Sequence, residues 1–435
     1  VERVLASPRI RTSPFADHHA AERTAGIVYL PTTSYIEMNE WSLPAGPAGE
    51  YAAFVAAEKS AGRYDARKGF LRGGIWRNFM SRYPEANWMH KRMLALSGRL
   101  AALPPGPPHD ELRPLLHLAQ ANDAYWHGLF GGLYLPHLRR EVYCNLLKLE
   151  AALDAVAPRP PLAVSDQDFD GVRELFLGNA DVQVVVKLDA HAALCELDAY
   201  GLAHNFGDVL TQRAEHYYHK LDAAPEAVNE QAGIASAHDR VAFKDVIVPA
   251  DVAPDARPRR LFADAWHRLD GETAWPQYAA EAFKAPLMSA VFTSPLDGGE
   301  VTKTITLAGR TLQVAYRLRN VPGGRFSVEI NLAMPSCDGY SGRYVLADGS
   351  IPCGFGQALD LAASQRLTLD DRVLGGGLVL SASRPVDIRA RPHYTVSQSE
   401  AGFEKIMQAA CITLSWPIDA VSQELTISLE ILADK

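Results

Sequence analysis

The stretch AQANDAYWHGLFGGLYLPHLRR, residues 119–140, carries both reactive side chains and strong backbone signals. An acid, two aromatic residues and a histidine fall within five positions, at Asp123, Tyr125, Trp126 and His127. Two glycines and a proline follow, which predicts a short and sharply bent backbone. Aromatic faces combined with carboxylate and imidazole groups are suited to binding sugar rings and their hydroxyls. The alternative is a corner between two helices whose aromatic residues belong to the core.

Helices are predicted on both sides of this stretch, because apolar residues recur there at spacings of three and four. One begins at Pro84 and ends before the prolines of residues 104–108, which lack a backbone donor and clash with a preceding turn. A second is expected over about 111–124 and a third over about 135–156. Three helices with short connections predict a small bundle.

Beyond a proline-rich link at residues 158–161 the apolar period becomes two, which is typical of half-buried antiparallel strands. Turn residues separate the alternating segments, and many such strands predict a large β-sandwich. Residues 200–240 interrupt the pattern and are interpreted as a loop with a short helix near 209–221. The strands are expected at 182–188, 312–318, 326–332 and 425–431, with glycine-rich hairpin turns at 354–356 and 375–377.

Composition narrows the class of protein. The chain has 435 residues, of which 48% are hydrophobic and 22% charged, as expected for two or three globular domains. A net charge of −8 disfavours nucleic-acid binding, and no apolar run is long enough to predict a membrane span. Five scattered cysteines without a CxxC spacing predict neither a disulfide framework nor a zinc site, so we expect a cytoplasmic protein without cofactor or metal.

The N-terminal region contributes another candidate site. The chain begins at Val1 without methionine and without a signal-peptide pattern, which we interpret as a start inside a domain, although removal of an initiator residue would look the same. A strand is predicted at 26–30, and Glu40 and Trp41 follow it in the segment 31–44. Barrels of the α/β type place their sites after strands. The alternative is a helix start with acids at its positive end.

Two further segments allow two interpretations each. Arg77, after a glycine pair, either faces a ligand or belongs to a tight turn that leads into the bundle. His216 and His219, in EHYYH, stand one helical turn apart and could both ligate a metal. No third ligand with suitable spacing is nearby, so a satisfied pair at the surface or at a sheet edge is favoured. The chain has no GxSxG sequence and no cysteine in an activating context, so we expect no serine or cysteine nucleophile.

Taken together, these segments resemble glycoside hydrolase family 57, and within it the 4-α-glucanotransferases and related α-amylases. The resemblance extends over about residues 24–435, with gaps in the sandwich. The segments that carry it are YLPTTSYIEMNEWSLP at 29–44, GGIWRNFMSRYPEANWMHKRM at 73–93, NDAYWHGLFGGLYLPHLR at 122–139, HDRV at 238–241 and VSQSEAGFE at 396–404.

The resemblance implies a multidomain α+β fold. We expect residues 1–60 to be the end of an incomplete (β/α)7 barrel, 61–160 a helical bundle and 161–435 an antiparallel β-sandwich. It also implies retaining transfer or hydrolysis of α-1,4-glucans by two carboxylates. In the family the nucleophilic glutamate and the acid–base aspartate precede the YLPT segment. We therefore expect that this chain lacks the reacting pair and is inactive alone.

Residue roles follow from the same resemblance. Trp41 and Trp126 are expected to stack on sugar rings, Asp123 to accept a bond from a hydroxyl and His127 to donate to a sugar oxygen. Glu40 matches the last barrel motif, and Arg77 is expected to orient Asp123 or Glu40 through a forked ion pair. The expected ligand is an α-glucan or maltooligosaccharide, and the protein assembly expected is a homodimer. The rival hypothesis is a non-catalytic module that binds glucan or completes a partner's site.

Overall fold

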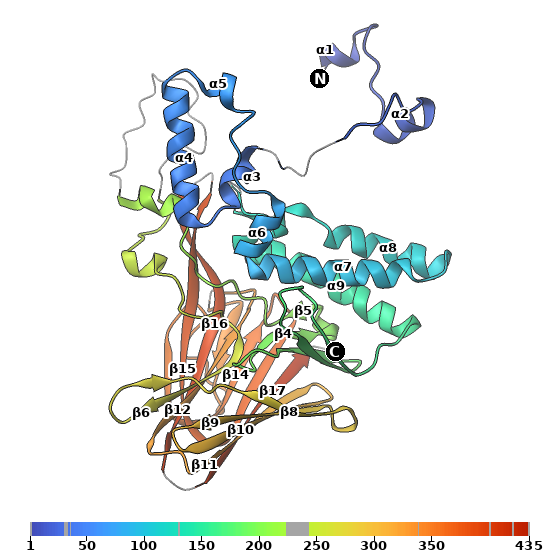
Figure 1. The fold of residues 1–435 in the computed structure, drawn as a ribbon. Helices are drawn as coiled ribbons and strands as arrows, with labels where there is room; N and C mark the ends of the chain where they lie inside the picture. Colours follow the sequence, from blue (N-terminus) through green and yellow to red (C-terminus); the bar gives the residue numbers. More distant parts are fainter. Residues whose placement is uncertain are drawn as a thin grey trace.

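The computed structural model describes residues 2–29, 34, 36–128, 131–222, 243–337, 339–399, 402–419 and 422–433. It is an α+β protein, in which helices come first and antiparallel strands follow (Figure 1). The α-helices are α1 (Glu2–Leu5), α2 (Phe15–Ala21), α3 (Ile36–Trp41), α4 (Ala45–Ser60), α5 (Tyr64–Arg67), α6 (Trp76–Arg82), α7 (Pro84–Ala101), α8 (Pro107–Ala119) and α9 (Pro136–Val156). The 3-10 helices are η1 (Asn122–Tyr125), η2 (Gly132–Tyr134), η3 (Tyr200–Leu202), η4 (His216–Asp222), η6 (Pro249–Val252) and η7 (Ala285–Leu287).

The strands occupy most of the second half of the chain. They are β1 (Leu162–Ser165), β2 (Glu174–Gly178), β3 (Val182–Lys187), β4 (Leu194–Ala199), β5 (His204–Asn205), β6 (Leu261–Arg268), β7 (Thr273–Ala274), β8 (Ala279–Lys284), β9 (Ser289–Leu296), β10 (Gly299–Ala308), β11 (Thr311–Arg319), β12 (Gly324–Leu332), β13 (Gly342–Val345), β14 (Leu359–Asp371), β15 (Gly376–Ser399), β16 (Gly402–Ile418) and β17 (Gln423–Ala433). The four strands expected from alternation correspond to β3, β11, β12 and β17, which confirms those predictions.

The long strand β15 belongs to two groups of paired strands. Its first part pairs with β17 in the order β8–β9–β10–β11–β17–β15–β14–β13. Its second part pairs with β16 in the order β1–β2–β3–β4–β6–β12–β16–β15. Buried side chains from both groups form one large apolar core. Two antiparallel layers around a shared core give the architecture of a sandwich.

Tight turns connect several of these strands. Between β9 and β10 the two-residue loop is Asp297–Gly298, and both residues have a positive φ, of 47° and 82°. This conformation matches the right-handed twist of the strands that it joins. Gly375, at φ 68°, ends the turn from β14 into β15, so the hairpin predicted at 375–377 is confirmed.

The helical bundle consists of α7, α8 and α9, which Figure 1 shows stacked over one end of the strands. Proline occupies the first turn of all three helices, where its missing N–H costs nothing. The first and third helices agree with the prediction. The second does not, since it begins at Pro107 and ends at Ala119 instead of spanning 111–124. The prolines interpreted as a terminator therefore also begin a helix.

The strand β3 is buried on both faces, although alternation predicted a half-buried strand. Val182, Val184 and Val186 face the sandwich core, whereas Val185 joins the apolar core of the bundle with Phe176 of β2. The helices thus cover the face that would otherwise meet water. This packing fixes the bundle against the strands.

The N-terminal segment differs from the rest of the molecule. Residues 2–29 are exposed apart from partly covered Ser7, and Figure 1 shows α1 and α2 apart from the main body. The strand predicted at 26–30 is wrong for residues 26–29, which have no regular structure, and Leu30 lies outside the described residues. A strand forms only by bonding to a neighbour, and no described strand pairs with this segment. A barrel remnant at 1–60 stays a prediction.

Candidate functional site

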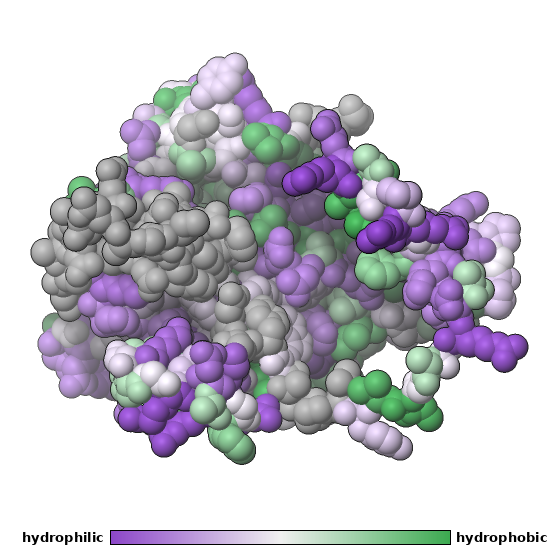
Figure 2. All heavy atoms as spheres, turned by 90° about the horizontal axis from the view of Figure 1, so that it is seen from above, coloured by the Kyte–Doolittle hydropathy of each residue, from purple (hydrophilic) through white to green (hydrophobic). Residues whose placement is uncertain are grey.

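An aromatic cluster joins the segments that the sequence analysis singled out. It combines residues from the segments 29–44, 73–93, 122–139 and 396–404 with part of EHYYH. Figure 2 shows the molecule from above, where apolar and polar side chains are interspersed over the surface that is visible. The buried members are Met38, Trp41, Phe79, Met80, Tyr83, Ala86, Trp126, Leu133, Tyr134, Leu210, Tyr217, Val396 and Phe403. Motifs far apart in the sequence therefore meet at one place.

Trp41, at the end of α3, lies between two histidines of the aromatic cluster. Its ring centroid is 4.6 Å from that of His127 and 5.0 Å from that of His216, with the rings nearly perpendicular in both pairs. Edge-to-face geometry directs the positive edge of one ring at the negative face of the other. Trp41 is 5% exposed and also packs against Tyr217, with ring centroids 5.6 Å apart, so surrounding residues cover nearly all of its surface.

Glu40, the residue before Trp41, pairs with one of the same histidines. Nε2 of His216 lies 2.6 Å from Oε1 of Glu40. The histidine is buried, while the glutamate side chain is 33% exposed. The contact therefore holds a carboxylate at the boundary between the aromatic cluster and solvent.

Glu215 is the polar centre beneath this boundary. Its Oε1 accepts bonds from the hydroxyls of Tyr83 (2.7 Å) and Tyr134 (2.6 Å), and its Oε2 pairs with Arg82. Burial and the Glu215 carboxylate raise the pKa of both tyrosines well above the usual value, so both remain donors. Arg82 also donates to the backbone oxygen of Trp41 at 2.9 Å. The end of α3 is thus tied to α6 and η4.

His127 is held in a neutral state. Burial lowers its pKa well below the usual value, and the nearby charge of Arg82 lowers it further. Its Nε2 lies 3.0 Å from the hydroxyl oxygen of Tyr217. In this arrangement the imidazole supports the aromatic cluster from inside.

The bend in the quoted stretch depends on glycine. Gly131 and Gly132 have φ angles of 87° and 47°, and a Cβ on Gly132 would lie 1.9 Å from the backbone oxygen of Trp126. That oxygen accepts a bond from the N–H of Leu133 at 2.7 Å. The tight approach returns the chain into α9 and places Tyr134 against Glu215. Residues 129 and 130 lie outside the described part.

The glycine pair in the segment 73–93 has an equally specific role. A Cβ on Gly73 would lie 2.1 Å from the backbone oxygen of Asn39. That oxygen accepts a bond from the N–H of Gly74 at 2.8 Å, and the Asn39 side chain accepts one from Gly73 at 3.2 Å. The two glycines therefore let the turn before α6 lie directly against α3, which carries Glu40.

The predicted site residues fall into two groups. Asp123 and Arg77 are exposed, whereas Trp41, Trp126 and His127 are buried. Trp126, at 8% exposure, packs against Phe79 with centroids 5.0 Å apart. The alternative of a helical corner with core aromatics thus describes their packing, and their sugar-stacking role stays a prediction.

The arginine of the site differs from the predicted one. Among the described residues Arg77 forms no ion pair with Asp123 or Glu40; His216 pairs with Glu40, and Arg82 serves as the buried guanidinium.

Sequence reasoning missed Arg82, Glu215 and Tyr217. Glu215 and Tyr217 belong to EHYYH, which was considered only for its histidines. Of the two histidines in EHYYH, His219 contacts the backbone oxygen of His216, and His216 is buried rather than at the surface. The HDRV segment lies outside the described residues.

One group of acids has the proximity that a metal site requires within the described part of the chain. Asp166, Asp168 and Glu174 place carboxylate oxygens within 4.8 Å of one another. The ammonium of Lys187 already lies among them, 3.1 Å from Asp168 and in contact with Glu174. A lysine therefore supplies the positive charge at this position.

Comparison with known proteins identifies the relatives of the chain. A family described as alpha-amylase/4-alpha-glucanotransferase, C-terminal, matches residues 166–430, and the corresponding middle domain matches 74–153. A 4-alpha-glucanotransferase of Thermococcus kodakarensis is 34% identical over 96% of this chain and 62% of its own length. An alpha-amylase of Pyrococcus abyssi is 32% identical, with the same coverage.

A solved structure agrees with these matches. The crystal structure of the 4-alpha-glucanotransferase of Thermococcus litoralis superposes with a TM-score of 0.73 at 27% identity, covering 99% of this chain and 62% of that one. The chain thus spans about three fifths of the length of these relatives. None of the described helices combines the length and the apolar character needed to cross a bilayer.

Proposed function

The chain belongs to the alpha-amylase/4-alpha-glucanotransferase family, and on this premise we propose that it acts in α-1,4-glucan processing by retaining glycosyl transfer or hydrolysis. In this activity, the residues of this chain bind the substrate. The nucleophile and the acid–base catalyst lie outside these 435 residues, as the motif order of the family implies. The substrate is an α-glucan or maltooligosaccharide. Transferase and hydrolase differ only in whether a sugar or water accepts the glycosyl group.

The Glu40–His216 pair is the observation that supports this proposal most directly. A buried histidine 2.6 Å from a partly exposed carboxylate restricts the rotamers of that carboxylate. An oriented carboxylate accepts hydrogen bonds from sugar hydroxyls in one geometry, and so can select among hydroxyl positions. The family motif that contains Glu40 is thereby held in place by EHYYH, a segment outside that motif.

The other predicted site residues differ in how directly they would contact the substrate. Asp123 and Arg77 are exposed and meet the ligand without rearrangement. Trp41 and Trp126 contact a sugar only at the edges that they leave uncovered, and His127 acts by holding the Trp41 ring. Polar contacts therefore carry most of the recognition, with aromatic packing behind them.

A binding and turnover experiment on the 435-residue chain tests the proposal. We expect maltoheptaose to bind without release of products, and Glu40→Gln to weaken binding by about tenfold through loss of a charge-assisted hydrogen bond. The matched control is Glu50→Gln, an exposed acid on α4. An unchanged affinity in Glu40→Gln would remove the role of this pair. Turnover that Asp123→Ala abolishes would show that the reacting groups are in this chain.

A further inference from the structure

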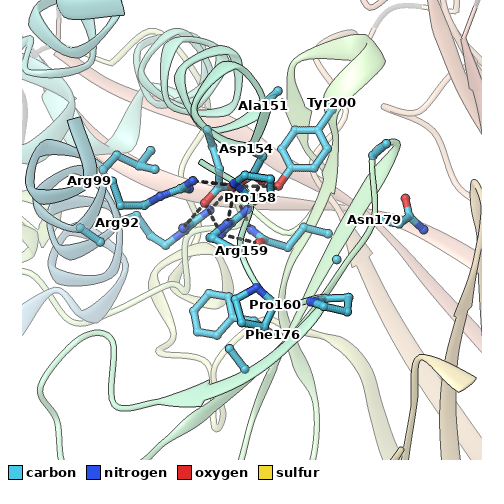
Figure 3. Close-up of a pocket in the computed structure, with 18 of the residues that line it drawn as sticks. Arg92, Arg99, Ala151, Asp154, Pro158, Arg159, Pro160, Phe176, Asn179 and Tyr200 are labelled. Atoms are coloured by element: carbon cyan, nitrogen blue, oxygen red, sulfur yellow. Dashed lines mark hydrogen bonds and ion pairs between the residues drawn. The ribbon is translucent and has the colours of Figure 1, made fainter. Parts of the chain in front are cut away.

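A pocket of about 610 Å³ lies where the bundle meets the first strands of the sandwich. Its walls come from α7, α9, the proline-rich segment 158–161 and the strands β1, β2 and β3, and we call it the link pocket (Figure 3). Its volume falls within the range of about 300–1,000 Å³ typical of small-molecule sites. Neither Glu40 nor any member of the aromatic cluster lines it.

A ladder of ion pairs forms one wall of the link pocket (Figure 3). Arg99 donates to Asp154 at 2.7 Å. Arg159 binds both oxygens of Asp154, at 2.9 and 2.7 Å, and donates to Glu150 at 2.6 Å. Arg92 completes the ladder with two bonds to Glu150, at 2.9 and 2.8 Å. The paired geometry makes this wall rigid.

The charges of this wall balance one another. Arg92 also pairs with Glu196 at 3.0 Å and with Asp198 at 3.8 Å, so the three arginines meet four carboxylates. Burial alone would raise the pKa of Glu150, but Arg92 and Arg159 lower it to about 2, which keeps it ionised. Burial and Glu196 raise the pKa of Asp198 well above its usual value, which favours its neutral form. A charged ligand would lose hydration here without finding an uncompensated partner.

The link pocket still has hydrogen-bonding capacity and an apolar side. The polar side chains of Asn179, Gln183 and Tyr200 are among the residues that line it. Figure 3 shows Phe176 and Pro160 on the side of the pocket away from Arg99. The rings of Pro158 and Pro161 add apolar surface. Polar side chains together with an apolar surface suit a neutral ring that carries both hydroxyls and C–H faces.

We propose that the link pocket binds a short maltooligosaccharide segment as a second glucan site of this chain. The ligand class rests on the proposed function, whereas the position rests on the size of the pocket, the balanced charges of its wall, and its polar and apolar lining. A glucan bound here would contact the bundle and the sandwich at once. Such a site would retain a long chain on the protein while another part of that chain lies at Glu40.

Two variants test the pocket without disturbing its core. Arg99→Met removes the charged group of a residue that lines the pocket, and Asp154 keeps its two bonds to Arg159. Ala163→Trp adds bulk from an exposed position of β1 at the mouth of the pocket. The matched control is Arg113→Met, an exposed arginine of α8 that does not line the pocket. The readouts are maltoheptaose affinity and hydrogen exchange of residues 157–165, with inorganic phosphate as the charged probe.

We expect maltoheptaose to slow exchange of residues 157–165 in the unmodified chain and in Glu40→Gln. Arg99→Met and Ala163→Trp should lower affinity at this site by about tenfold, and Arg113→Met should leave it unchanged. Maltoheptaose binding that depends on Glu40 but leaves residues 157–165 unprotected would overturn the pocket alone. Protection of 157–165 with no effect of Glu40→Gln would instead overturn the role of Glu40. Protection by phosphate but not by maltoheptaose would overturn a neutral ligand.

Discussion

His216 and Glu40 meet through Nε2 and Oε1 at 2.6 Å, and the ring of His216 also contacts that of Trp41. His216→Phe keeps a ring against Trp41 but removes the partner of the carboxylate. We expect a loss of about 1–3 kcal/mol in the free energy of unfolding. In a double-mutant cycle with Glu40→Gln, urea unfolding should give a coupling of about 1 kcal/mol or more. Additive effects would mean that the two groups do not interact in solution.

The buried pair of Arg92 and Glu150 joins α7 to α9, and its arginine also reaches β4 through Glu196. Arg92→Leu leaves the buried carboxylate of Glu196 without its arginine, and Glu150 keeps only Arg159 as a charged partner, so we expect the free energy of unfolding to fall by about 3–5 kcal/mol. Arg113→Leu, on the exposed face of α8, should change it by less than about 0.5 kcal/mol. Equal effects of the two substitutions in urea denaturation would argue against the pair as a stabilising link.

Gly132 adopts a positive φ and lies against the backbone oxygen of Trp126. Gly132→Ala should therefore cost more than about 2 kcal/mol, because the backbone must move as well as bear the strain of the left-handed conformation. The control is Gly98→Ala in α7, where an added Cβ meets no neighbour. That substitution should stabilise the protein by about 0.5–1 kcal/mol. Thermal denaturation of both variants measures the difference in sign.

Glu174 gives the fold a pH dependence of definite sign. Burial raises its pKa to about 7, although Lys187 opposes the rise, while the usual value is 4.5. Between these values the folded protein binds more protons than the unfolded chain, so stability falls as pH rises through this window. Relative to Glu174→Gln, the unmodified protein should lose at most about 3 kcal/mol between pH 4.5 and pH 7. A parallel pH profile for the two proteins would contradict the shift.

The exposed segment 26–29 should exchange its amide hydrogens at the rate of an unstructured chain. Its residues have no regular structure, whereas those of β3 are buried within a ladder of hydrogen bonds. Native-state hydrogen exchange should therefore separate the two regions by several orders of magnitude in protection. Slow exchange at 26–29 in a monomer would mean that these residues pair with a neighbour after all.

Periodicity predicted the elements whose surroundings repeat along the chain. The leucine spacing of α9 and the alternation of β11 and β17 each reflect one buried face, and the structure confirms all three elements. The predictions that were wrong concern residues whose structure or burial depends on contacts with segments distant in the sequence. Residues 26–29 have the apolar and aromatic side chains of a strand but pair with none of the described strands, and Val185 of β3 is covered by helices that no local pattern reveals.

The candidate site was predicted only in part, for the same reason. The motifs located Glu40, Trp41 and Trp126, and these do gather at one place. The pairing of Glu40 with His216, and of Arg82 with Glu215, depends on contacts between distant segments. Spacing within EHYYH suggested a metal pair or, more favoured, a satisfied pair at the surface or a sheet edge, because a local pattern does not reveal a carboxylate on another helix.

Val185 of β3 has a consequence for how the molecule can be divided. Sequence comparison separates the chain near residues 153–166, yet this valine and Phe176 complete the interior of the bundle from the far side of that boundary. Cutting the polypeptide there would expose apolar surface on both fragments. The two regions match separate family domains, but they share this apolar core. We therefore expect them to unfold together in one transition.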